Sequence, residues 1–299
     1  MSNMVTVADD YFHVAENDLD WRESYYFNFV SHDHRTAGFT TIGVLPNRKK
    51  AEFVLFLICE GKPITYFREI ELPASDQPPG IVSDNALTYT LLEPMQRWKV
   101  GFSGEKLELR ITWVSRFPFY DFGRGSGTSW KGHFEQSGVI KGEAVLPNDR
   151  RIRIEGYGQR DKSWGPRNWH IEKWFAFHAQ FEAYAIGLRR DTANGAVHVS
   201  GGLSSNNGQI PASQVEFEMI YDSGDERNPS GAVTTIKYAN GDSIYLRSRL
   251  VSPGSFVKFR RDFPSGSTEL FEGMAIHECS DTGEKGTGLI EFLTTYPKR

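Results

Sequence analysis

The sequence has few cysteines, no long apolar run and no leader-like start. Its two cysteines, Cys59 and Cys279, allow one long-range disulfide or two thiols, and two buried thiols in a reducing compartment are the expected state. No stretch approaches 18 consecutive apolar residues, so no membrane span is expected. The opening segment, MSNMVTVADDYFHVAEND, lacks a basic region followed by an apolar run. We therefore expect no signal peptide and a cytoplasmic protein.

An excess of positive charge is also lacking. The formal net charge is -4 and the longest basic run is Arg48–Lys50, which argues against a nucleic-acid surface. The sequence contains no Gly-x-Ser-x-Gly motif, so covalent hydrolysis has little support. The glycine-rich segment GRGSGTSWKG, residues 123–132, lacks the Gly-Lys-Ser/Thr ending of a phosphate-binding loop. It is interpreted as a loop that leads to Trp130.

The eight histidines are scattered and give no recognisable metal site. His32 and His34 lie two apart, as do His133 and Glu135, and each pair would share one face of a strand. Neither pair has a third ligand nearby in the sequence. We expect no metal site and no cofactor.

Period-two alternation is present along most of the chain. In LELRITWV the apolar residues Leu107, Leu109, Ile111 and Trp113 share one face of the expected strand. Three hairpins are expected at turn residues, namely Pro46-Asn47, Pro147–Asp149 and Asn240-Gly241. The pattern predicts an all-β, antiparallel protein with few helices. Because a single open sheet of this width would curl or split, two tandem β-barrels or sandwiches are expected, in residues 1–165 and 166–299.

The strand expected after this boundary, WFAFHAQFEAYAIGL, has two different faces. Phe175, Phe177, Ala179, Phe181 and Ala183 would form an apolar face. The other face would hold rings and titratable groups: Trp174, His178, Gln180, Glu182 and Tyr184. That second face is either an exposed face with a chance histidine and glutamate or the wall of a cavity.

The segment GYGQRDKSWGPRNW, residues 156–169, concentrates charge and tryptophan at one strand end. If Asp161 faces a dry pocket, its pKa rises and it becomes a proton donor near neutral pH. If Arg160 or Arg167 folds back onto it, the pair is a structural clamp. The rings of Trp130, Trp164 and Trp169 either stack on an apolar ligand or fill the seam between two domains.

These residues carry a family resemblance. The segment from His133 to Trp169, with Glu135-Gln136 and Gly-x-Gly-x-Arg-Asp-x-Ser-Trp-Gly-x-Arg at Gly156 to Arg167, resembles the two-domain lipocalin-like (calycin) proteins related to AttH and to carotenoid hydratase. A histidine commonly stands where this chain has Lys162, which puts any imidazole role there in doubt. The resemblance implies tandem calycin-like barrels. It also implies kinship with cofactor-free enzymes, tocopherol cyclase-like and Diels–Alder-type cyclases among them, that hydrate, cyclise or rearrange polyenes and terpenoids.

The leading hypothesis is a cofactor-independent enzyme for a large apolar terpenoid, polyene or polycyclic substrate, acting by hydration, cyclisation or isomerisation. Asp161 is the expected acid, with Glu135, His178 and Glu182 as further acid/base candidates. The expected ring contacts are Trp130, Tyr157, Trp164, Trp169, Trp174 and Tyr184. Arg160 and Arg167 are expected to tie the two halves by charge-assisted bonds. The rival is a non-catalytic carrier of lipophilic ligands, and a weaker third idea is a carbohydrate-active protein. A homodimer is left open.

Overall fold

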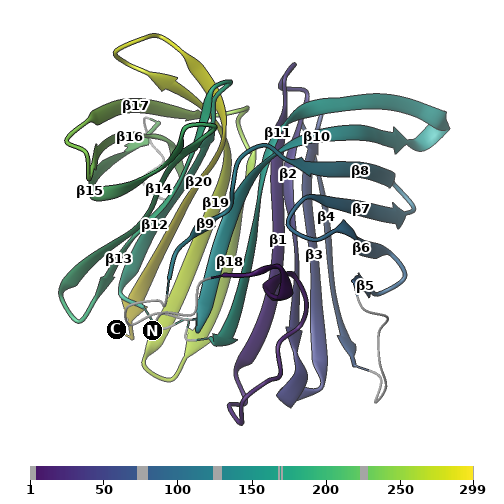
Figure 1. Ribbon diagram of the computed structural model, residues 1–299. Coiled ribbons are helices and arrows are strands. Elements are labelled where there is room, and N and C mark those ends of the chain that lie inside the picture. The colour runs from purple at the N-terminus through teal and green to yellow at the C-terminus, as the bar shows by residue number, and fades with distance from the viewer. Residues whose placement is uncertain are drawn as a thin grey trace. The chain divides into compact units, whose positions relative to one another are not determined.

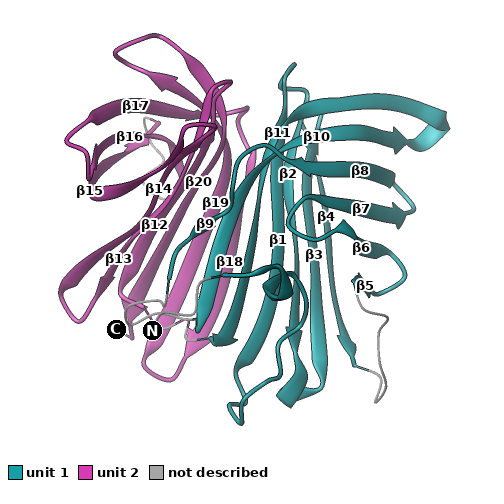
Figure 2. Ribbon diagram, viewed as in Figure 1, with its two compact units in different colours: residues 1–125, 129–167 teal, residues 126–128, 168–299 magenta. Residues whose placement is uncertain are grey.

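The computed structural model describes residues 5–72, 80–123, 130–167, 169, 171–222 and 228–298. The glycine-rich segment between Gly123 and Trp130 lies outside these ranges. The chain divides into two compact units, residues 1–125 with 129–167 and residues 126–128 with 168–299 (Figure 2). In the described residues the regular structure is β-strand with three short 3-10 turns, at Val7–Asp10, Pro46–Arg48 and Pro147–Asp149, which confirms the all-β expectation.

The first unit is one eleven-stranded antiparallel sheet in the order β4-β3-β2-β1-β11-β10-β8-β7-β6-β5, with β9 paired to β10 (Figure 1). Its strands are β1 Trp21–Ser31, β2 Thr36–Leu45, β3 Lys50–Cys59, β4 Lys62–Glu71, β5 Ile81–Ser83, β6 Leu87–Glu93, β7 Arg97–Gly104, β8 Leu107–Ser115, β9 Tyr120–Asp121, β10 Gly132–Leu146 and β11 Arg150–Pro166.

This sheet curls around one hydrophobic core without closing. Phe53 of β3 and Tyr89 of β6, from opposite halves of the strand order, belong to the same buried cluster. The two end strands are not paired with each other in that order. Instead, Tyr66 of β4 donates its hydroxyl to Asp84 Oδ2 at 2.5 Å, and its ring lies 5.0 Å from that of Phe102. The first unit is therefore a half-barrel whose open side is joined by side chains.

The second unit has nine strands in the order β17-β16-β15-β14-β13-β12-β20-β19-β18. Its strands are β12 Lys173–Gln180, β13 Tyr184–Ala193, β14 Ala196–Ser205, β15 Gly208–Tyr221, β16 Pro229–Tyr238, β17 Ser243–Leu250, β18 Phe256–Phe263, β19 Gly266–Cys279 and β20 Lys285–Pro297. An additional pairing of β17 with β19, from Leu246↔Cys279 to Leu250↔Ala275, closes eight of these strands into a barrel. β18 lies outside the ring, along the first half of β19.

The expected hairpins are present. The segments meet at the 3-10 turns Pro46–Arg48 and Pro147–Asp149 and at Asn240-Gly241, where Gly241 has φ +94°. Asn148 adopts φ 66°, a left-handed conformation that asparagine tolerates better than most residues. Cys59 and Cys279 are both buried free thiols, as expected.

Gly156 and Gly158 allow β11 to lie unusually close to β1. A Cβ on Gly156 would lie 2.2 Å from the carbonyl oxygen of Val30, and one on Gly158 would lie 2.3 Å from that of Asn28. Both separations are far shorter than any real contact of this kind. This close approach fixes the pairing of β1 with β11, from Trp21↔Pro166 to Ser31↔Gly156, and so fixes which side chains stand beside Asp161.

Candidate functional site

β11 carries different chemistry on its two faces because successive side chains of a strand point to opposite sides. Arg160, Lys162 and Trp164 lie on the side of the hydrophobic core, which we call the core face. Gln159 and Asp161 lie on the other side, which we call the opposite face. The neighbouring strands follow the same division, since Asp161 pairs with Tyr26 of β1 and with Glu135 of β10.

On the core face, Arg160 is ion-paired to the N-terminal segment. Its Nη1 donates to Asp10 Oδ1 at 2.6 Å, and the exposed fractions of the two side chains are 1% and 0%. Its Nε donates to Gln136 Oε1 at 3.1 Å, and the guanidinium lies 5.2 Å from the centre of the Trp113 ring. Arg160 is therefore a clamp within the first unit and does not pair with its sequence neighbour Asp161.

Lys162 forms a second buried ion pair on the same face. Its Nζ donates to Glu23 Oε2, and both side chains are almost fully buried. The imidazole of His13 also contacts Glu23, at 3.2 Å, and stacks on Trp164 with 4.0 Å between ring centres. Burial raises the pKa of Glu23, but Lys162 and His13 outweigh it and leave that pKa below its usual value. Burial lowers the pKa of Lys162, against the opposing effect of Glu23.

The opposite face holds a group of titratable side chains that we call the acid–histidine cluster: His133, Glu135 and Asp161. His133 Nε2 lies 3.5 Å from Glu135 Oε1 and 3.8 Å from Asp161 Oδ2. Both separations exceed a normal hydrogen bond and fall within ion-pair range. The side chains of His133 and Glu135 are 6% exposed, whereas that of Asp161 is 24% exposed. Asp161 is thus the member of the cluster that a ligand can reach.

Aromatic rings enclose the imidazole. The ring of Trp130 meets His133 edge to face at 4.6 Å, and that of Phe122 lies tilted against it at the same distance. Gln159 donates its side-chain amide to Glu135 Oε2, which holds this carboxylate in place. Two further polar residues of this face are buried: Asn28 is 1% exposed and Gln159 2%. Polar groups placed in such surroundings interact more strongly than in water.

The cluster has the components of a general acid/base system. Two carboxylates flank one imidazole, so a proton can be held on any of the three and moved between them over a short distance. The sequence interpretation named Glu135 as an acid/base candidate and considered His133 only as its partner in a pair with metal-ligand spacing. Within the described residues, no three His, Cys, Asp or Glu side chains are arranged to hold a metal ion.

The remaining first-unit candidates lie apart from this cluster. Arg167 donates from Nη2 to Ser163 Oγ at 2.8 Å and to Ser24 Oγ at 3.2 Å. The ring of Tyr157 lies under the Arg116 guanidinium, with 3.7 Å from its centre to Cζ. These contacts of Arg160 and Arg167 join strands and segments of the first unit. The expectation that these arginines tie the two halves together stays a prediction.

In the second unit, Trp174 and His178 share the face of β12 that points away from the barrel core. The indole of Trp174 donates to Glu291 Oε1 at 2.6 Å, and Arg189 Cζ lies 4.0 Å from the centre of its ring. The Trp169 ring centre lies 6.1 Å from that of Trp174. His178 is 4% exposed. Phe175, Phe177, Ala179 and Phe181 lie in the barrel core, as the alternation predicted.

Two candidates do not lie where the alternation put them. β12 ends at Gln180, so Glu182 falls in the turn before β13 and is exposed. Tyr184 begins β13 and stacks on Phe181 at 4.6 Å, against the barrel core. Burial raises the pKa of its hydroxyl, and Glu284 raises it further. The expectation that both share a face with His178 was wrong, because the chain turns after Gln180 and the alternation starts again.

Sequence reasoning missed the partners that bury the cations of β11. Asp10 lies 150 positions from Arg160, and Glu23 lies 139 positions from Lys162. The one signal available was the pattern itself: Arg160 and Lys162 lie two apart, so they share one face of the strand, and cations on a buried strand face require acidic partners.

The expectation of no membrane span concerns a different feature, the helices. No helix in the described part of the chain is long and apolar enough to span a membrane.

Solved structures share this two-unit fold. A putative AttH from Nitrosomonas europaea matches with a TM-score of 0.69 at 13% identity, over 95% of each chain. The structure of CghA with Sch210972 matches with a TM-score of 0.66 at 12% identity, over 93% of this chain and 89% of that one. Kievitone hydratase from Nectria haematococca matches with a TM-score of 0.63 at 12% identity, over 98% of this chain and 93% of that one. The expected likeness to AttH-like two-domain β-proteins is confirmed at the level of fold.

Sequence comparison gives the family. No curated protein matches the sequence. Residues 6–295, nearly the whole chain, match the model of one family, which is described only as a domain of unknown function. The match spans both units and includes β11 with its two differently charged faces. The chain therefore belongs to this family, DUF7064.

Proposed function

We propose that the protein is an enzyme that adds a proton to an apolar, unsaturated substrate and thereby hydrates, cyclises or isomerises it. The observation that carries the proposal is the acid–histidine cluster: a partly exposed Asp161 backed by a buried imidazole and a second buried carboxylate. A purely structural ion pair would need one acid and one base. Here two acids share one imidazole on a face that also presents Trp130.

The chemistry balances without an added cofactor. Protonated Asp161 gives its proton to one carbon of a double bond, which leaves positive charge on the neighbouring carbon. In a hydration, water bonds to that carbon and its surplus proton returns to the Asp161 carboxylate. In a cyclisation or isomerisation, a proton leaves another carbon and returns to the same carboxylate. His133 and Glu135 hold or resupply this proton between turnovers.

The rings support the same chemistry. Phe122 and Trp130 flank His133 and keep water from its imidazole, which favours directed proton transfer over exchange with solvent. The fold comparison adds an analogy only, since a shared fold hosts many reactions. One neighbour bears the name of a hydratase, at 12% identity. The terpenoid, polyene or polycyclic nature of the substrate belongs to this proposal on the same analogy.

The experiment begins with native mass spectrometry of the purified protein and identification of any molecule that co-purifies. That molecule, and unsaturated terpenoids of its class, are then incubated with the wild type and with Asp161→Asn. We expect Asp161→Asn to lose turnover by about a hundredfold or more while it still binds the substrate. Glu182→Gln, in the exposed turn after β12, is the matched control and should retain full turnover.

Other outcomes would change the assignment. Binding with no turnover in the wild type would make the protein a carrier of lipophilic ligands, which is the alternative function. Full turnover in Asp161→Asn would remove the cluster from the mechanism. Failure to bind any apolar compound would overturn both functions.

A further inference from the structure

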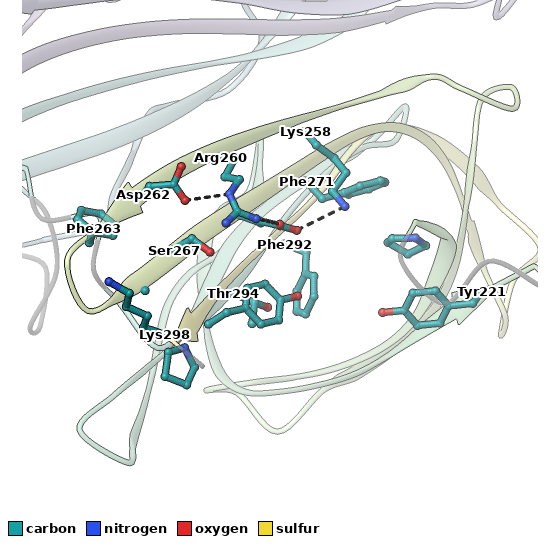
Figure 3. Close-up of a pocket in the computed structure, with 15 residues that line it drawn as sticks. Tyr221, Lys258, Arg260, Asp262, Phe263, Ser267, Phe271, Phe292, Thr294 and Lys298 are labelled. Atoms are coloured by element: carbon teal, nitrogen blue, oxygen red, sulfur yellow. Dashed lines mark hydrogen bonds and ion pairs between the residues drawn. The ribbon is translucent and has the colours of Figure 1, made fainter.

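The second unit contains a cavity at one end of its barrel, with a volume of about 1040 Å³ (Figure 3). Its lining comes mainly from β18, the first half of β19 and the end of β20, with Tyr221 of β15 and Pro229 of β16 completing it. None of the residues of the acid–histidine cluster contributes to it. The cavity therefore requires an explanation of its own.

The strand pairing explains why the barrel is open here. β17 closes the ring against β19 only along Ala275–Cys279. Along Gly266–Gly273, β19 pairs with β18 and not with β17. Because β18 is the last strand in the order, its other edge is not paired with a strand of this sheet. The barrel consequently widens at this end, and the inward side chains of β18 to β20 line a cavity rather than a packed core.

The deep part of the lining is aromatic. Phe271 is 3% exposed and its ring stacks on Phe256 at 5.0 Å. The ring of Phe292 lies edge to face on Phe217 at 6.3 Å, and Phe217 in turn stacks on Phe175 of the barrel core. These rings are held by their neighbours and form a rigid apolar floor. Such a floor suits the hydrocarbon part of a ligand.

The rim of the cavity is charged, and the cations outnumber the anions. Lys258 Nζ lies 3.5 Å from Glu269 Oε2, while Arg260 contacts Glu269 at 3.1 Å and Asp262 at 3.0 Å. Lys298 also lines the cavity and has no ion-pair partner among the residues that the structure describes. Three cations against two carboxylates leave one positive charge in excess. Edge-strand charges serve to prevent aggregation in many sheets, but these side chains point into a cavity.

We propose that this cavity binds a small amphipathic carboxylate, such as a long-chain fatty acid. Its hydrocarbon part lies over Phe271 and Phe292, and its carboxylate lies at the rim with Lys258, Arg260 and Lys298. One negative charge neutralises the excess, and the carboxylate gains charge-assisted hydrogen bonds from two kinds of cation. The volume lies just above the usual range for small-molecule sites, roughly 300–1000 Å³, which fits a ligand with a long apolar portion.

The test is a fluorescence titration with cis-parinaric acid, a fluorescent fatty acid, and with its uncharged methyl ester. We expect saturable binding of the acid at one site and binding of the ester weaker by roughly tenfold or more, since a hydrogen bond to a charged group contributes at least that much. The variant Lys258→Met/Lys298→Met changes the excess charge at the rim from positive to negative. It should weaken binding of the acid by a similar factor and leave binding of the ester unchanged.

The matched control is Lys237→Met/Lys285→Met. It removes two exposed lysines from the same barrel outside the cavity, and it should bind the acid as the wild type does. Equal affinity for acid and ester would overturn the proposal. Unchanged affinity for the acid in the Lys258→Met/Lys298→Met variant would also overturn it, whether or not that variant aggregates. The charges would then serve only to prevent aggregation through the edge strand β18. Loss of probe binding in Asp161→Asn alone would place the probe at the acid–histidine cluster and also overturn it.

Discussion

Arg160 and Asp161 are adjacent in the sequence and belong to different chemical environments. Arg160 points to the core face of β11 and is ion-paired to Asp10 at 2.6 Å, with both side chains buried. Asp161 points to the opposite face and lies 3.8 Å from His133, with a quarter of its side chain exposed. One strand therefore separates a clamp from an acid by a single residue, and the two can be tested independently.

Arg160→Met is expected to destabilise the first unit strongly. It leaves the Asp10 carboxylate buried without its partner, and breaking a buried pair costs about 3–5 kcal/mol. The free energy of unfolding, measured by denaturant titration, should fall by that amount. In Arg160→Met/Asp10→Asn the unpaired charge is absent, so much of the loss should be recovered. A double variant no more stable than Arg160→Met would show that the pair is not the cause.

Gly158→Ala is expected to disturb the pairing of β1 with β11. The new Cβ would meet the carbonyl oxygen of Asn28 at 2.3 Å, so the two strands must separate. Overpacking of this kind costs roughly 1–3 kcal/mol or more. Gly101→Ala in β7 is the control, since its Cβ would have no neighbour closer than 3.9 Å. It should be neutral or slightly stabilising, and similar losses in both variants would refute the steric explanation.

Tyr66→Phe tests how the open side of the half-barrel is held. The change removes the hydroxyl that donates to Asp84 and keeps the ring that packs on Phe102. Because the hydrogen bond goes to a carboxylate, we expect a loss of about 1.5–3 kcal/mol in the free energy of unfolding. Tyr245→Phe, at an exposed tyrosine of β17, should change it by less than about 0.5 kcal/mol. An unchanged Tyr66→Phe protein would mean that core packing alone keeps the sheet curled.

His277 should make the second unit sensitive to acid. The side chain is buried in the barrel, where its Nδ1 lies 2.8 Å from Ser248 Oγ, and burial lowers its pKa from 6.5 to about 3. Between those values the unfolded chain binds a proton that the folded barrel does not. Stability from this group is therefore complete above about pH 6.5 and falls by about 1.4 kcal/mol per pH unit as pH drops toward 3.

The corresponding variant is His277→Asn, which keeps a polar atom near Ser248 and removes the titration. The slope of unfolding free energy against pH should lose this component between pH 6.5 and 3. His34→Asn, at an exposed position with φ 58°, is the control for the removal of a histidine from the surface. If the two variants show the same slope, His277 does not determine the acid sensitivity.

Local signals in the sequence predicted the strands well and their ends less well. Asn240-Gly241 and Pro147–Asp149 mark turns because few other residues tolerate those backbone angles, so both hairpins were predictable. The alternation from Phe175 to Phe181 identified the barrel-facing side of β12. It failed at Glu182 and Tyr184, because nothing in the alternation itself shows where a strand stops.

The candidate site was predicted only where its members are neighbours on paired strands. Asp161 and Glu135 were both chosen from the sequence, and the register of β10 with β11 places them side by side. His133 carries no local sign of its role, since its contact with Asp161 depends on that same register. The ion pairs of Arg160 and Lys162 depend on residues more than a hundred positions away, which no local pattern specifies.

The pairing of β1 with β11 has a consequence for synthesis of the chain. These are the first and last strands of the first unit, and Ser31 meets Gly156. After Ser31 the ribosome must add 125 residues, the last of them Gly156, before that edge of β1 finds its partner. At typical elongation rates this takes roughly 6–25 seconds. Throughout this interval Asp10 and Glu23 lack Arg160 and Lys162, so the first unit cannot complete its two buried ion pairs until β11 has been synthesised.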